Sequence, residues 1–169
     1  MVKGKSKIVL VAHNVRSAHN VGALLRMAEG LGVEKVYLSG YTPYPEAPGD
    51  QRLPHVRRRA ATRISKTALG AENSLQWAHA DDISKLVRQL KKQGFTLLAL
   101  EQAVSSLKLP NYSPPTAVAL VVGNEVAGLS QEILDTVDDC LEIPMLGKKE
   151  SHNVASAAAM ALYHLKFYA

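Results

Sequence analysis

The sequence contains a single cysteine, Cys140, among 169 residues. One cysteine cannot form an internal disulfide and has no second thiol with which to share a metal, so Cys140 is expected to be a small, buried residue of a strand. No apolar run approaches the roughly 18 residues that cross a bilayer. The basic N-terminal stretch MVKGKSK is followed by too short an apolar run for a signal peptide. We therefore expect a single cytoplasmic domain over residues 1–169.

Several familiar site motifs are also missing. The sequence has neither GxGxxG nor a Walker loop, which removes support for enzymes that bind nucleotide cofactors through those turns. It also lacks GxSxG, the turn that carries the serine nucleophile of α/β-hydrolases. The six histidines show neither HExxH nor His-plus-Cys spacing, so no metal is expected.

Positive charge exceeds negative charge, since twenty Lys and Arg against fifteen Asp and Glu give a net charge of +5. The excess gathers in RLPHVRRRAATRISK, residues 52–66, which contains no carboxylate. Such a patch suits a phosphate backbone, because neutralising phosphates releases condensed counterions. A solvated loop with a solubilising run of charge is the alternative. The basic residues of this stretch are Arg52, Arg57, Arg58, Arg59, Arg63 and Lys66.

Short apolar runs alternate with helical patterns along the chain. The predicted strands are KIVLVA, KVYLSG, FTLLAL, AVALVV and LEIPM. The predicted helices are residues 21–31, a short stretch at ALGAE, DDISKLVRQLKKQG, SQEILDTV and residues 153–168. Asp81 is expected to begin the third of these helices and Gly94 to end it. The alternation predicts an α/β fold whose mainly parallel sheet is covered by helices on both faces.

The stretch NVRSAHNVGALLR follows the first predicted strand. The apolar positions that recur in it and just beyond it at helical spacing are Val21, Leu24, Leu25 and Ala28. At 100° per residue, Arg26 lies about 150° from the centre of that stripe, so it points away from the core of its own chain. Periodicity alone therefore favours a surface arginine, and Asn20 could do no more than satisfy free amides in the first helical turn.

The stretch LVVGNEVAGLS occupies residues 120–130 and follows a second buried strand. The strand breaks at Gly123, a residue type that permits the close backbone approach a ligand-holding turn needs. Asn124 and Glu125 follow at once. Alone this is a weak signal, because tight turns after strands often contain Gly and Asn.

The stretch LEIPMLGKKESHNVASAAAMALY carries Lys148 and Lys149 in a turn, then Ser151 and Asn153 at the start of an alanine-rich helix. Ser and Asn are common N-caps, and that interpretation remains open. Three predicted strand ends thus carry polar residues, at the edge where open α/β sheets bind their ligands.

Taken together and in this order, the three stretches resemble the three motifs of the SpoU/TrmH branch of the SPOUT RNA methyltransferases. NVGALLR is similar to the first motif, LVVGNEVAGLS to the second and IPMLGKKESHNVASAAAMALY to the third. The resemblance extends from about residue 7 to residue 165. It implies a parallel sheet whose C-terminal part forms a deep trefoil knot, a rare exception to ordinary chain topology. It also implies S-adenosylmethionine as methyl donor, a homodimer, and methyl transfer to a ribose 2′-hydroxyl of tRNA or rRNA.

The resemblance also implies roles for individual residues. The implied catalytic residues are Arg26, Asn20, Glu125, Ser151 and Asn153. The implied donor-binding residues are Leu100, Gly123, Asn124, Ile143, Met145 and Ser151. Because no separate RNA-binding domain is evident, RNA contact is expected to fall to the basic residues of 52–66 and to Lys148 and Lys149.

Arg26 is implied to act at a site completed by a second subunit, which would explain why it points away from its own core. It is either the base that takes the proton of the 2′-hydroxyl or a cation that holds a phosphate and stabilises the emerging alkoxide. Guanidinium groups are almost always charged, but the sequence alone does not separate these roles.

The sequence departs from the family pattern at His152, where many members carry Leu, and a solvent-facing histidine is expected there. Two other functions compete with a methyltransferase. A non-catalytic RNA-binding module on the same fold is disfavoured because the polar motif residues are all retained. A flavodoxin-like nucleotide or signalling domain would predict phosphate-binding or acidic clusters at strand ends, which the sequence does not suggest.

Overall fold

The computed structural model describes residues 6–168, so most of the basic N-terminal stretch lies outside the described residues. Within that range the strands form one seven-stranded sheet in the order β3-β2-β1-β6-β4-β7-β5, and every strand pair is parallel. The strands are β1 (Lys7–His13), β2 (Lys35–Ser39), β3 (Trp77–Ala80), β4 (Thr96–Leu100), β5 (Leu107–Lys108), β6 (Ala117–Val122) and β7 (Asp139–Glu142). The chain places β2 and β3 on one side of β1 and then crosses to β4 and β5 on the other side. It finally inserts β6 between β1 and β4, and β7 between β4 and β5.

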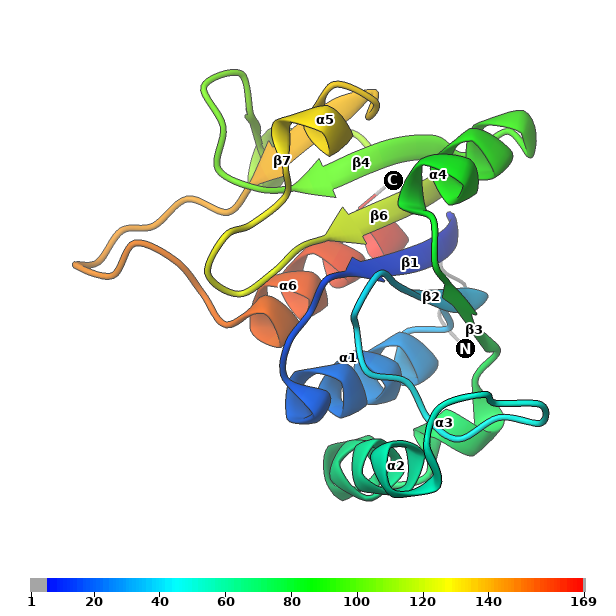
Figure 1. Cartoon of the computed structure of the whole chain (residues 1–169). Coiled ribbons are helices and arrows are strands. Elements are labelled where there is room, and N and C mark those ends of the chain that lie inside the picture. Colours follow the sequence, from blue (N-terminus) through cyan, green and yellow to red (C-terminus); the bar gives the residue numbers. More distant parts are fainter. Residues whose placement is uncertain (1–5, 169) are drawn as a thin grey trace.

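Helices cover both faces of this sheet, which confirms the predicted α/β fold (Figure 1). They are α1 (Ala18–Gly30), α2 (Pro54–Ala68), α3 (Ala71–Ser74), α4 (Ile83–Lys92), α5 (Gln131–Leu134) and α6 (Val154–Phe167), with a 3-10 turn at Leu109–Asn111. α1 and α6 lie on one face and α4 and α5 on the other. In the described part of the chain, no helix has the length and apolar character needed to cross a membrane.

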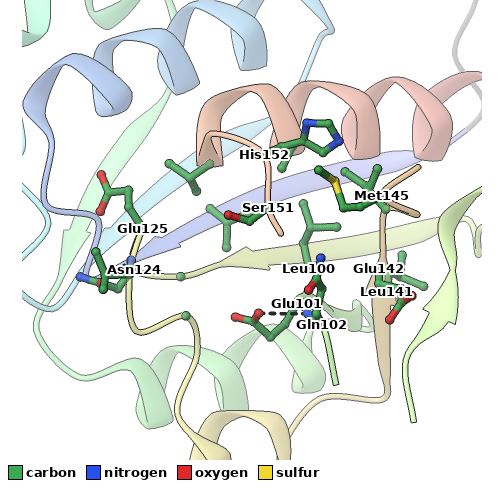
Figure 2. Close-up of a pocket in the computed structure, with 17 residues that line it drawn as sticks. Leu100, Glu101, Gln102, Asn124, Glu125, Leu141, Glu142, Met145, Ser151 and His152 are labelled. Carbon is green, nitrogen blue, oxygen red and sulfur yellow. Dashed lines mark hydrogen bonds between the residues drawn. The ribbon is translucent and has the colours of Figure 1, made fainter. Parts of the chain in front are cut away.

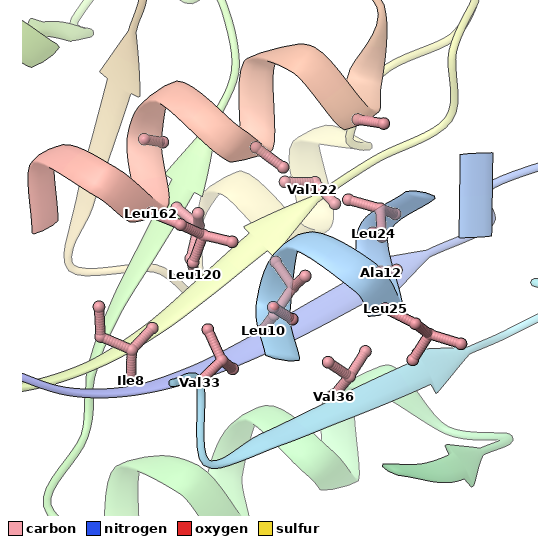
Figure 3. Close-up of a cluster of buried hydrophobic side chains, with 14 of the residues drawn as sticks. Ile8, Leu10, Ala12, Leu24, Leu25, Val33, Val36, Leu120, Val122 and Leu162 are labelled. Atoms are coloured by element: carbon pink, nitrogen blue, oxygen red, sulfur yellow. The ribbon is translucent and has the colours of Figure 1, made fainter. Parts of the chain in front are cut away.

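The core has two apolar layers, one on each side of the sheet. Ile8, Leu10 and Ala12 of β1 belong to the layer under α1 and α6, shown in Figure 3. Val9 and Val11 of the same strand belong to the layer under α4 and α5. Successive side chains of a strand point to opposite faces, so a strand covered on both sides must be apolar at every position. This is why residues 8–12 of β1 and 117–122 of β6 are all apolar.

The basic stretch 52–66 is helical, because it forms most of α2, so it is not the solvated loop considered above. The short helix expected near ALGAE corresponds to α3, whereas the 15-residue α2 before it was not predicted. α2 ends at Ala68, and the backbone then reverses through positive φ at Leu69 (50°) and Gly70 (95°) before α3 begins. Only Ile64 and Ala68 of α2 are buried, so the helix lacks the apolar stripe by which periodicity detects helices.

α2 packs against α1 at a notch formed by Gly22. A Cβ at this position would lie 2.2 Å from both the Ile64 carbonyl oxygen and Thr67 Oγ1. The Thr67 hydroxyl also donates a hydrogen bond to the His19 carbonyl at 2.8 Å. Glycine at position 22 therefore lets the basic helix lie directly beside the first turns of α1.

Three smaller expectations concern α4 and β7. Asp82, and not Asp81, caps α4, and its carboxylate accepts from the Lys85 N–H at 3.0 Å. Gly94 follows the end of that helix with a φ of 85°, as expected of a helix terminus. Cys140 lies in β7 as predicted but is only half-buried, and burial raises the pKa of its thiol.

Candidate functional site

A cavity of about 180 Å³ opens at the carboxyl ends of β6, β4 and β7. One water molecule needs roughly 10–15 Å³ on this measure, so the cavity has room for a small organic ligand. It includes the carboxyl end of β6, whose neighbour in the sheet is β1. The strands that follow these two along the chain, β7 and β2, lie on opposite sides of the pair, and open α/β sheets bind ligands at such a position. Its lining comes from three connections, at residues 100–102, 122–128 and 141–157.

All six residues implied to bind the methyl donor line this cavity. They are Leu100, Gly123, Asn124, Ile143, Met145 and Ser151. Figure 2 shows Asn124 and Glu125 on one side of the cavity and Glu142 and Met145 on the other, with Ser151 between them. The structure therefore brings together segments that are far apart in the sequence, and it does so at one strand edge.

Asn124 holds the shape of the turn at residues 124–128. Its Oδ1 accepts from the N–H groups of Val126 and Ala127, both at 2.8 Å, and its Nδ2 donates to the Asn14 carbonyl at 3.1 Å. Asn124 and Gly128 also exchange backbone hydrogen bonds. The side chain of Asn124 is thus engaged within the protein, and the residue shapes the cavity wall.

Glu125 accepts three hydrogen bonds from the start of α1. The donors are the N–H groups of Arg16 and Ser17, at 2.9 and 3.0 Å, and Asn20 Nδ2, at 2.8 Å. Partial burial raises the pKa of this carboxyl, but the hydrogen bonds outweigh burial, and the net pKa lies below its ordinary value. Glu125 is therefore ionised at neutral pH and tied to the first motif.

Asn20 links the first motif to the third. Its Oδ1 accepts from Asn153 Nδ2 at 3.1 Å, while Asn153 Oδ1 accepts from the Ala155 N–H and caps α6. The N-cap interpretation of Asn153 is therefore confirmed, but the same side chain also reaches the start of α1. Asn153, Asn20 and Glu125 form a continuous polar chain beside the cavity, with one member from each motif.

Arg26 lies elsewhere in the single chain. It is exposed on α1, as the helical periodicity predicts, and it is not among the described residues that line the cavity. It borders a shallow depression together with Ala23, Met27, Lys66 and Thr67. Of the five implied catalytic residues, Glu125 and Ser151 line the cavity, and Asn20 and Asn153 are joined to Glu125 by hydrogen bonds. Arg26 lies apart from these four on α1.

The basic residues of 52–66 fall into two groups. Arg52 is used within its own loop, where it pairs with Asp50 at 2.6 Å, donates to the Tyr44 carbonyl at 3.1 Å and lies over the Tyr44 ring. Arg57 lies 2.9 Å from a carboxylate oxygen of Glu46. The exposed basic residues of α2 are Arg58, Arg59, Arg63 and Lys66. Lys148 and Lys149 are also exposed, in the turn before α6.

Two carboxylates at the cavity were not selected from the sequence. Glu101 directly follows β4, and its Oε2 accepts from the Leu129 N–H at 3.0 Å. Glu142 ends β7 and accepts from Ser106 Oγ and Lys108 Nζ. Their positions at the carboxyl ends of strands were a signal that could have found them.

Together with Glu125 they bring three carboxylates to the cavity lining, each with hydrogen-bond partners of its own. Among residues 6–168, no three His, Cys, Asp or Glu side chains are grouped so that they could hold a metal ion. His152, the departure from the family pattern, is exposed and lines the cavity next to Ser151.

Known proteins share the sequence pattern over nearly the whole chain. The model of the SpoU rRNA Methylase family matches residues 7–163. The tRNA (guanosine(18)-2′-O)-methyltransferase of Aquifex aeolicus is 30% identical over 95% of this chain and 69% of its own length. The 23S rRNA (guanosine-2′-O-)-methyltransferase of Neisseria meningitidis serogroup B is 28% identical over 92% of this chain and 56% of its own length. The chain thus spans little more than half the length of several curated relatives.

Solved structures share the fold. An RNA 2′-O ribose methyltransferase superimposes with a TM-score of 0.77 at 25% identity, over 98% of this chain and 57% of that one. An AdoMet-bound rRNA methyltransferase from Sinorhizobium meliloti superimposes with a TM-score of 0.79 at 21% identity, over the same shares of the two chains. Because the family model covers all three motifs and the strands that carry them, this chain belongs to the SpoU rRNA methylase family.

Proposed function

We propose that this protein transfers a methyl group from S-adenosylmethionine to a ribose 2′-hydroxyl of tRNA or rRNA, in the cytoplasm. Its family and the activities named for its relatives support this function. The observation that carries it is the convergence of six implied donor-binding residues on one cavity, with a polar chain from all three motifs beside it.

The cavity lining suits S-adenosylmethionine. Leu100, Leu141 and Ile143 provide an aliphatic wall of the kind that binds a purine. Glu101 and Glu142 place negative charge around a ligand that carries positive charge on sulfur and on its amine.

S-adenosylmethionine, when bound, supplies a methyl group on a positively charged sulfur. The protein must hold the ribose 2′-oxygen in line with that group and release one proton to water. We assign the positioning to Asn20 and Asn153, whose amides are fixed by each other and by Glu125. Glu125 accepts three hydrogen bonds in its ionised form, so it is a positioning residue and not a base.

We assign Arg26 to the stabilisation of charge on the ribose oxygen and on a neighbouring phosphate, since a guanidinium binds both by charge-assisted hydrogen bonds. Arg26 does not line the cavity of its own chain but borders a separate depression on α1. We therefore propose that it reaches the cavity of a second copy of the chain. Exposed apolar side chains on α6 support a homodimer, because Met160 is 39% and Tyr163 52% exposed, and large apolar surfaces mark interaction sites.

We further propose that the connection between β7 and α6 passes through the trefoil knot of the family. A hydrogen bond from Gln102 Nε2 to the Glu150 carbonyl at 2.8 Å supports this, because it holds the connection after β4 against the segment that leads into α6. RNA is assigned to the exposed face of α2 and to Lys148 and Lys149.

Donor binding and methyl transfer test this function separately. We expect calorimetry to detect S-adenosylmethionine binding and radiolabelled donor to methylate bulk RNA at ribose. Arg26→Ala should lower methyl transfer by at least about a hundredfold, because the charge that stabilises the transition state is lost. Donor affinity should change by less than about twofold, because Arg26 is assigned to the ribose oxygen and a phosphate and not to the donor. Full activity of Arg26→Ala would contradict its role.

The alternative function is RNA binding without catalysis. It predicts RNA binding with neither donor binding nor methyl transfer by the wild-type protein. Mapping ribose methylation in RNA from cells with and without the gene would then identify the nucleotide if methyl transfer is observed.

A further inference from the structure

Tyr41 is an exposed aromatic residue whose position is fixed at both ends. It lies two residues after β2, and 62% of it is exposed. Its hydroxyl accepts from Asn124 Nδ2 at 2.8 Å, and its backbone N–H donates to Asn14 Oδ1 at 3.1 Å. The ring is thus oriented by the protein while much of its surface remains open to solvent.

The backbone on either side is shaped for this placement. Gly40 has a φ of 65°, and a Cβ there would lie 2.1 Å from Asn14 Oδ1. Asn14 also has a positive φ, of 56°, which is uncommon outside glycine but tolerated by Asn. Two unusual backbone conformations therefore support the position of one exposed ring.

The ring lies next to a residue that lines the proposed donor cavity. Asn124, its hydrogen-bond partner, lines the donor cavity, and the next residue, Glu125, holds Asn20. The hydroxyl of Tyr41 is therefore one hydrogen bond away from the cavity wall. With the ribose held beside Asn20, as proposed above, the base joined to that ribose is within reach of the side of the cavity where Tyr41 stands.

We propose that Tyr41 stacks on a nucleobase of the RNA at the methylation site, an inference that rests on the proposed function. Unpaired RNA bases bind proteins largely by stacking on aromatic side chains. Tyrosine has few torsions to fix, and the bond to Asn124 already restricts them, so little conformational freedom is lost on binding. A packing role is not supported, since Tyr41 takes part in none of the aromatic ring pairs among residues 6–168.

The test compares two fluorescent probes, a short oligoadenylate and an abasic ribose-phosphate oligomer of the same length. Both carry the same phosphate charge, so the difference in affinity reports the bases. We expect Tyr41→Ala to bind oligoadenylate roughly five- to a hundredfold more weakly than wild type, since one stacked base contributes that much, and to bind the abasic oligomer equally well. Tyr41→Phe keeps the ring and should stay within about threefold of wild type on both probes.

Tyr168→Ala is the matched control, because Tyr168 is 65% exposed and lies at the other end of α6 from the cavity; it should bind both probes as wild type does. Equal affinity of wild type and Tyr41→Ala for oligoadenylate overturns the stacking role. Equal losses on both probes, or a loss of S-adenosylmethionine affinity in Tyr41→Phe, also overturn it and make Tyr41 a support of the 124–128 turn. A wild-type protein that binds neither probe contradicts RNA as the substrate, and with it the proposed function.

Discussion

Glu125 organises residues from two distant parts of the chain. Two of its three donors are the N–H groups of Arg16 and Ser17, just before α1 begins, and the third is the side-chain amide of Asn20 in the first turn of the helix. A carboxylate at this end of a helix is also favoured by the helix dipole. One side chain of the second motif therefore stabilises the start of α1 and fixes the orientation of Asn20.

The lowered pKa of Glu125 predicts a pH-dependent contribution to stability. The carboxylate stabilises the fold fully above its ordinary pKa of 4.5, and the contribution is lost as pH falls through the lower folded value. Glu125→Gln should therefore reduce the free energy of unfolding at pH 7 by about 1 kcal/mol, a modest value because the group is only partly buried. The difference should shrink toward zero at acidic pH.

Urea unfolding of both proteins between pH 7 and pH 3 measures this difference. Glu29→Gln is the matched control, since Glu29 is exposed on the same helix, and it should match wild type across the range. A destabilisation by Glu125→Gln that did not vary with pH would assign the effect to packing instead of charge.

The sequence predicted side-chain positions better than side-chain partners. The orientation of Arg26 followed from helical periodicity, and the cavity residues followed from the family motifs. Glu101 lies beside the Leu129 amide only because β4 and β6 are neighbours in the sheet. Such a contact depends on tertiary structure, so local patterns in the sequence do not reveal it.

At the level of elements, α2 is the clearest difference from expectation. The central strands were predictable because each is covered on both faces and is therefore continuously apolar. Only Ile64 and Ala68 of α2 are buried, next to Gly22 of α1, so most positions of the helix can carry basic residues. Because α2 buries so few residues, it lacks the apolar periodicity that reveals a helix, and for the same reason it presents a charged surface.

The exposed face of α2 predicts how RNA affinity responds to charge. Reversal of Arg58, Arg59 and Arg63 to Glu should weaken RNA binding by at least about tenfold. It should also make binding less sensitive to salt, because each lost phosphate contact reduces the slope of log K against log salt by about 0.7–0.9. Donor affinity should not change, because none of these residues lines the cavity. Filter binding across a salt series measures both quantities.

Reversal of Lys85, Arg88 and Lys92 on α4 is the matched control, because these exposed residues carry the same charge on the other side of the sheet. Equal effects of the two triple variants would indicate attraction by net charge alone and would remove the special role of α2.

At the level of the whole molecule, the separation of Arg26 from the cavity predicts complementation between inactive subunits. If Arg26 acts across the interface, a dimer of one Arg26→Ala and one Asn20→Ala chain has one complete site and one site without either group. Random mixing of the two proteins after unfolding and refolding should then restore about a quarter of wild-type methyl transfer, as expected for a two-fold symmetric dimer.

Each variant refolded alone is the control and should remain inactive. A mixture that stays as inactive as its components would place Arg26 at the cavity of its own chain and contradict the proposed arrangement of the dimer.

The hydrogen bond between Asn153 and Asn20 joins positions 133 residues apart. Contacts of such long range slow folding, because a large loop must close before they form. They also make the cavity depend on a segment that leaves the ribosome after all the strands. A nascent chain that has not yet released α6 lacks one wall of the cavity and the partner of Asn20, so the site is incomplete until α6 has emerged.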